Sequence, residues 1–166
     1  MEPVLNLSAF GEVIPGKKKE TEDITFGSFM KDKGKEMDRT ANPGDLIAHK
    51  ALLHISQLKL FHWQTHSFAE HKALDDAFEE LIDLTDGLME STMGKYGRPK
   101  LSSSTAMNLT NYSENSPCSG YLQEMRNCYS QEIRSMLSSE KDSELLNIVD
   151  EIVALFDKTI YLLTLK

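Results

Sequence analysis

Histidines and acids are crowded at helical spacing into one stretch of the chain, and this stretch constrains the fold most. All five histidines lie between His49 and His71, and eight acids but only one base lie between Glu70 and Glu90. If the stretch is a helix, like-charged acids four residues apart face one another, and each such pair costs about 0.2–0.5 kcal/mol. The pairs are Asp75/Glu79, Asp76/Glu80, Glu79/Asp83 and Asp86/Glu90. Together they cost about 1–2 kcal/mol on a single helix.

The charged residues of this helix fall into two groups on a helical wheel. A line from His71 through Asp75 and Asp86 to Glu90 follows the border of the apolar stripe. A second group lies on the opposite side and is expected to be solvated: Asp76, Glu80 and Asp83. The stripe itself is made by Leu74, Phe78, Leu81, Ile82, Leu88 and Met89. We therefore expect any functional site of this helix to lie along the border line.

Helix start and stop signals surround this stretch. Asn42 followed by Pro43 is typical of an N-cap and a first helical residue, so the first helix is expected from there to about His66. A tight turn over residues 65–68 leads into a second helix, which Gly97 should end near Tyr96. Helices joined so closely lie antiparallel. We therefore expect His62 and His71, nearly equidistant from the turn, at one level of the molecule.

The remainder of the chain predicts two more helices and no strand. Residues 99–116 are rich in Ser, Thr and Asn and indicate a long connection with one helical turn near 105–109. Apolar residues keep helical spacing after Ser116-Pro117, and again from about Asp142 to the C-terminus. Four helices with a long connection between the second and third are typical of a ferritin-like four-helix bundle with a crossover. The predicted fold class is all-α, with the bundle occupying residues 43–166.

Residues 1–42 are expected to form a flexible or extended N-terminal arm. They carry seven Lys and Arg against eight acids and show no sustained period. Such an arm is not the uniformly basic tail that would grip DNA. The alternative is an arm that docks on a partner through apolar side chains: Leu5, Phe10, Phe26 and Phe29.

Charge and composition exclude several classes of function. The net charge of −8 and the pI near 5.1 argue against DNA as a partner. No apolar run approaches 18 residues and the N-terminus lacks a basic leader, so we expect a cytoplasmic protein without a membrane span. Two cysteines are too few for a disulfide framework.

The border line predicts a metal site that needs two chains. Asp75 and Asp86 are about 16 Å apart along a helix, so they cannot bind one ion together. If a second copy packs antiparallel across a two-fold axis, His71 and Asp75 of one chain lie beside Asp86 and Glu90 of the other. His62 would join the same half-site. Nitrogen and carboxylate ligands suit iron, manganese or zinc better than calcium or magnesium.

These residues also resemble a known family. The elements His62-Trp63, His71-x-x-x-Asp75 and Asp86-x-x-x-Glu90 are similar to the ferroxidase motif of the DNA-protecting mini-ferritins, the Dps family. The resemblance implies two histidines and an acid from one subunit, two acids from its two-fold mate, and Fe²⁺ as the ion that is oxidised. It implies no catalytic residue beyond the five ligands. The segments FHWQT, AEHKALDD and MGKYGR also resemble uncharacterised ferritin-like proteins of phages and large DNA viruses.

Three interpretations follow. The first is a homo-oligomeric ferroxidase built from two-fold dimers, with iron as the substrate and zinc or manganese as alternative ions. The second is a virus-associated structural protein that keeps the ferritin-like fold and uses residues 1–42 to bind other virion proteins. In the third, the second helix merely has an acidic solvent face, and His62 and His71 are packing residues.

Overall fold

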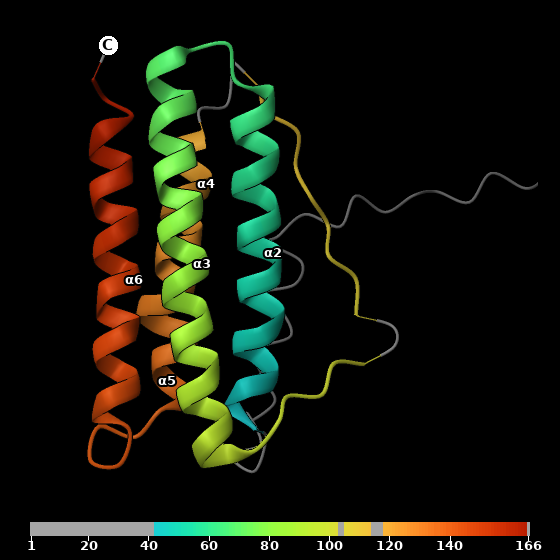
Figure 1. Cartoon of the computed structure of the whole chain (residues 1–166), viewed down its shortest axis with the longest axis vertical. Helices are drawn as coiled ribbons and strands as arrows, with labels where there is room; N and C mark the ends of the chain where they lie inside the picture. Colours follow the sequence, from blue (N-terminus) through green and yellow to red (C-terminus); the bar gives the residue numbers. More distant parts are fainter. Residues whose placement is uncertain (1–41, 103–104, 114–117, 166) are drawn as a thin grey trace, which may run out of the picture. The chain divides into compact units, whose positions relative to one another are not determined.

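The described part of the chain is helical. The computed structural model describes residues 42–102, 105–113 and 118–165, and its regular elements are all helices (Figure 1). This confirms the predicted all-α class for the described residues. The expected N-terminal arm, 1–42, lies outside the described residues except for Asn42.

The first described helix, α2 (Pro43–Gln64), begins where the sequence predicts. The side chain of Asn42 accepts a hydrogen bond from the Gly44 N–H at 2.9 Å, and Pro43 occupies the first helical position. The helix ends at Gln64, two residues before the expected end. Thr65 is extended, with its N–H bonded to the Phe61 carbonyl, because the chain must turn here into the next helix.

Helix α3 (Phe68–Tyr96) packs against α2 as its antiparallel neighbour (Figure 1). Ser67 is its N-cap, and the Ser67 hydroxyl accepts a hydrogen bond from the Glu70 N–H at 3.3 Å. The helix ends as predicted at Gly97, whose φ of 83° is a conformation that suits glycine. The hairpin that was expected to bring His62 and His71 to one level is therefore present.

The connection after α3 runs along α2 without a helix in its described residues. The predicted helical turn at 105–109 is wrong, since these residues are not helical. Two glutamines of α2 hold the residues that follow them by their backbone. Gln57 bonds both the N–H and the carbonyl of Thr110 at 2.7 Å, and Gln64 accepts the Tyr112 N–H at 2.7 Å. Figure 1 shows the segment, in yellow, passing along α2.

The third helical stretch contains a π-helix that the sequence analysis missed. It consists of α4 (Cys118–Asn127), η2 (Cys128–Ile133) and α5 (Arg134–Met136), and its expected start at 116–117 lies outside the described residues. Four buried residues recur at intervals of four: Met125, Tyr129, Ile133 and Leu137. An α-helix has 3.6 residues per turn, so this row would drift around it by about 120°. The wider π-turns keep the row directed at the core.

Helix α6 (Ser143–Leu162) completes the core. Its apolar face packs against α3 and α4, and Phe156 contacts Tyr129 of η2 with ring centroids 5.8 Å apart. The N-cap, Asp142, is only 1% exposed and is paired with Lys95 at 2.8 Å. This ion pair joins the end of α3 to the start of α6.

One carboxylate joins three segments at the opposite end of α3. Glu70 accepts hydrogen bonds from Thr65, from the Tyr112 hydroxyl at 2.8 Å and from the Cys118 thiol at 2.9 Å. Burial raises the pKa of Glu70, but the three hydrogen bonds outweigh it, so the pKa lies below its ordinary value. The turn before α3, the connection after α3 and the start of α4 are thus fastened to a single side chain.

Candidate metal centre

His62 and His71 form a reciprocal pair between the two helices of the hairpin. Nδ1 of His62 lies 3.2 Å from the His71 carbonyl oxygen, and Nδ1 of His71 lies 2.9 Å from the His62 carbonyl oxygen. The rings stack with their centroids 3.9 Å apart and an interplanar angle of 27°. The expectation that the hairpin brings these residues to one level is confirmed by this contact.

The pair fixes which nitrogen each ring presents. A carbonyl oxygen can only accept a hydrogen bond, so Nδ1 of both rings must carry the proton. In a neutral imidazole the lone pair is then on Nε2. Metal-binding histidines commonly donate their other ring nitrogen to a backbone carbonyl in this way. Nε2 is therefore the nitrogen of each neutral ring that has a lone pair to offer a divalent cation.

Asp75 lies next to His62. One of its carboxylate oxygens is 3.5 Å from Nδ1 of His62, and the side chain is 30% exposed. The structure thus brings His62 of α2 into contact with two other predicted ligands, His71 and Asp75 of α3.

A residue that the sequence analysis missed stands beside these three. The Lys59 ammonium lies 3.5 Å from the same Asp75 oxygen and 4.3 Å from the centre of the Phe78 ring. Lys59 precedes His62 by three residues, a spacing that places both on one side of α2. That spacing was visible in the sequence, but the partner helix that Lys59 faces was not.

Asp86 and Glu90 are not part of this cluster. Both are exposed residues further along α3, and eleven residues of helix separate Asp86 from Asp75 by about 16 Å. Within the described residues, no three His, Cys, Asp or Glu side chains of one chain are arranged to hold a metal ion. The five predicted ligands therefore do not come together as one site within the described residues of a single chain.

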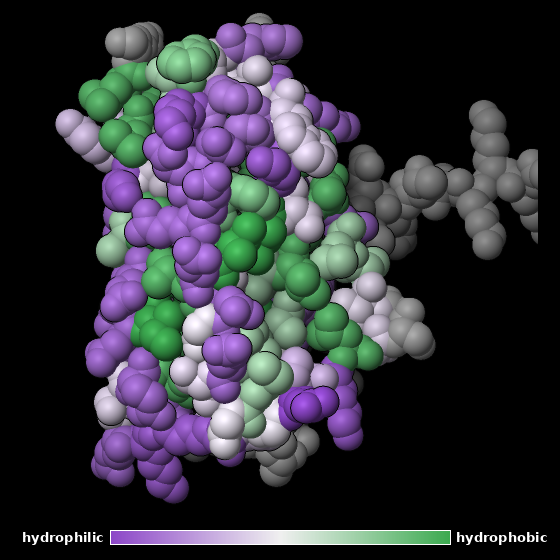
Figure 2. Space-filling model, viewed as in Figure 1, coloured by the Kyte–Doolittle hydropathy of each residue, from purple (hydrophilic) through white to green (hydrophobic). Residues whose placement is uncertain are grey.

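The surface around these residues, here called the α2–α3 outer face, is apolar at its middle. Figure 2 shows a hydrophobic patch over α3 and its border with α2. Leu52 is 47% exposed, Ile82 is 37% exposed and Trp63 is 70% exposed. The α2–α3 outer face is defined as the residues that share one side of each helix with the contacts of Lys59. They are Leu52, Ile55, Lys59 and Trp63 on α2, and Asp75, Phe78, Ile82, Asp86 and Met89 on α3.

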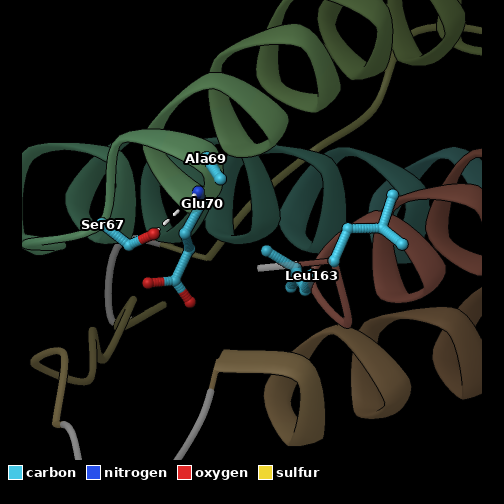
Figure 3. A pocket seen from close by; sticks show the side chains of 5 residues that line it. Ser67, Ala69, Glu70 and Leu163 are labelled. Atoms are coloured by element: carbon cyan, nitrogen blue, oxygen red, sulfur yellow. Dashed lines mark hydrogen bonds between the residues drawn. The ribbon is translucent and has the colours of Figure 1, made fainter.

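A separate hollow lies where the start of α3 meets the end of the chain. Its volume is about 340 Å³, and none of the five predicted ligands lines it (Figure 3). The lining residues are Ser67, Ala69, Glu70, Leu163 and Leu165.

Among the described helices, none has both the length and the apolar character needed to cross a membrane.

Comparison with known proteins places the chain in one family. Residues 62–163 match the model of a family of unknown function (DUF5856), and the chain belongs to that family. The matched region includes all five predicted ligands. No curated protein and no solved structure matches the chain.

Proposed function

We propose that this member of the DUF5856 family is a ferroxidase with a ferritin-like four-helix bundle, similar to the Dps mini-ferritins. The four helical stretches and the long crossover beside α2 support that fold. The observation that carries the function is the reciprocal histidine pair beside Asp75. Packing histidines need no common tautomer, whereas here both rings bond a backbone carbonyl through Nδ1, which leaves the lone pair of each neutral ring on Nε2. The Asp75 carboxylate lies beside one of the two rings, that of His62.

A second copy would supply the missing acids. Asp75 with Asp86, and His71 with Glu90, are centred on the same point of α3, between residues 80 and 81. An antiparallel mate crossing at that point places its Asp86 and Glu90 beside His71 and Asp75, and two equivalent sites result. Phe78 and Ile82 flank the centre, so Phe78 of each chain would lie near Ile82 of the other. Apolar contact at the axis would hold the charged sites apart at a fixed distance.

The completed site would bind Fe²⁺ as its substrate through imidazole nitrogens and carboxylates. Two Fe²⁺ ions each give one electron to hydrogen peroxide, which takes up two protons and becomes two water molecules. Carboxylate oxygens stabilise the more highly charged ferric product. Dioxygen is the alternative oxidant.

His71→Ala should abolish catalysed iron oxidation, because it removes one nitrogen ligand and the ring that stacks on His62. The measurement is the initial rate of ferric absorbance after aerobic Fe²⁺ is added, with and without peroxide. His66→Ala is the matched control, since His66 is exposed and lies outside the cluster. Equal rates for wild type and His71→Ala would refute the assignment.

Ile82→Arg should convert the dimer into a monomer of 18.8 kDa. The substitution places two guanidinium groups near one two-fold axis without disturbing the core, because Ile82 is already 37% exposed. Light scattering after gel filtration measures the mass. Tyr161→Arg on α6 is the control, since Tyr161 is 62% exposed on another helix. A dimer that survives Ile82→Arg would exclude this face as the interface.

A further inference from the structure

Lys59 occupies the place where a cation would approach Asp75. Its ammonium lies 3.5 Å from the carboxylate oxygen that also faces His62. The side chain is 29% exposed and its ammonium lies over the Phe78 ring, 4.3 Å from the centre. An ammonium between a carboxylate and an aromatic face is held by charge and by cation–π attraction.

A divalent ion and this ammonium compete for one carboxylate. Asp75 can direct its lone pairs to a metal only if the positive charge of Lys59 moves away, because two cations within a few ångströms repel strongly at a partly buried site. Lysine can make that movement, since its ammonium is carried on a flexible four-carbon stem. A single partly exposed ion pair contributes little to the stability of a fold, so the loss of the Lys59–Asp75 pair would leave the helices intact.

We infer that Lys59 is a built-in competitor of the metal: it neutralises Asp75 in the metal-free protein and must leave that carboxylate when a divalent cation binds. This inference rests on the proposed function, because it concerns the same half-site. As a consequence, a higher concentration of free metal ion is needed before the site is occupied. The protein binds Fe²⁺ only when the ion is abundant enough to displace the ammonium, and the metal-free helix pair avoids an unpaired carboxylate at its border.

Lys59→Met should tighten Zn²⁺ binding by about tenfold, because it removes the competing charge. Zn²⁺ is the probe because it takes nitrogen and carboxylate ligands without being oxidised. Methionine retains an unbranched stem and a favourable contact with an aromatic ring. Lys72→Met is the matched control: it removes the same charge from the same region, but Lys72 pairs with the exposed Asp76. Calorimetric titration should give less than a twofold change for this control.

A second measurement follows Lys59 itself. Acetylation of lysines by a reactive ester, read by mass spectrometry, should speed up at Lys59 as Zn²⁺ is added and stay constant at Lys72. The response should vanish in His71→Ala, which lacks one of the proposed ligands.

The titrations separate the inference from the proposed function. If wild type binds Zn²⁺ but Lys59→Met binds it equally or more weakly, Lys59 does not compete, and the inference is overturned while the proposed metal site stands. If neither protein binds Zn²⁺, the metal site fails, and the inference fails with it. Binding by Lys59→Met alone would support the inference most strongly.

Discussion

Asp86→Asn combined with Glu90→Gln should leave the protein folded but no longer stabilised by metal. If the proposed wild-type dimer binds metal, an ion at about one hundred times its dissociation constant would stabilise it by about 2.7 kcal/mol per site. The double mutant keeps His62, His71 and Asp75 but has no acids to offer its mate, so each half-site is too poor in ligands to bind tightly. Its metal-free form should be slightly more stable, because one like-charged pair costing about 0.2–0.5 kcal/mol is gone.

Thermal unfolding with and without Zn²⁺ or anaerobic Fe²⁺ measures both effects. Asp76→Asn with Asp83→Asn is the control, because it removes the same two charges from exposed positions of α3 outside the proposed site. That control should keep the full response to metal. If the Asp86/Glu90 variant is stabilised as strongly as wild type, the ion is bound within one chain and the two-fold arrangement is wrong.

Glu70→Ala should lower the free energy of unfolding by about 2–3 kcal/mol, which for a chain of this length lowers Tm by roughly 5–10 °C. The substitution removes the acceptor of three side-chain hydrogen bonds. One of the donors is the Cys118 thiol, which is 2% exposed and cannot turn to water. The connection after α3 and helix α4 would also lose their common anchor. Glu70→Gln is the conservative comparison, because it retains one acceptor oxygen and should cost about half as much.

The same carboxylate should make stability depend on pH in a defined direction. The pKa of Glu70 is lowered in the folded protein, so its contribution is fully present above the ordinary value of 4.5 and is lost as pH falls through the folded value. The gap between wild type and Glu70→Ala should therefore be wide at pH 7 and narrow in acid. Urea unfolding at several pH values measures it. A gap that widens toward acid would show that the folded state favours the protonated form.

The helix ends and the histidine pair could be predicted because they depend on local chemistry. Asn42, Pro43 and Gly97 act within a few residues of themselves, and a tight hairpin fixes the level of His62 against His71 by counting along the chain. The expectation that Asp86 and Glu90 come from a mate is of another kind. It depends on a contact between two chains, and it stays a prediction.

The features that could not be predicted from the sequence depend on contacts between segments that are distant in the chain. From the sequence, Gln57 is simply a polar residue of α2, yet it is fully buried because the connection after α3 covers it at Thr110. Tyr129 and Ile133 keep a spacing that an α-helix tolerates over short runs, so the π-helix emerges only when the whole row up to Leu137 must face one core. Lys59 belongs to the same group, since its partner lies on the other helix of the hairpin.

The two buried cysteines can serve as probes of local opening of the fold. Burial raises the pKa of the Cys128 thiol to about 12 and that of Cys118 also well above its ordinary value, so the folded protein holds almost no thiolate at neutral pH. Peroxide and alkylating reagents attack thiolates, and both sulfurs are therefore protected while α4 and η2 stay closed. The rate at which a thiol reagent modifies the native protein then measures how often each of these two segments opens. Cys118 reports the end of the molecule fastened by Glu70, and Cys128 reports the π-helix.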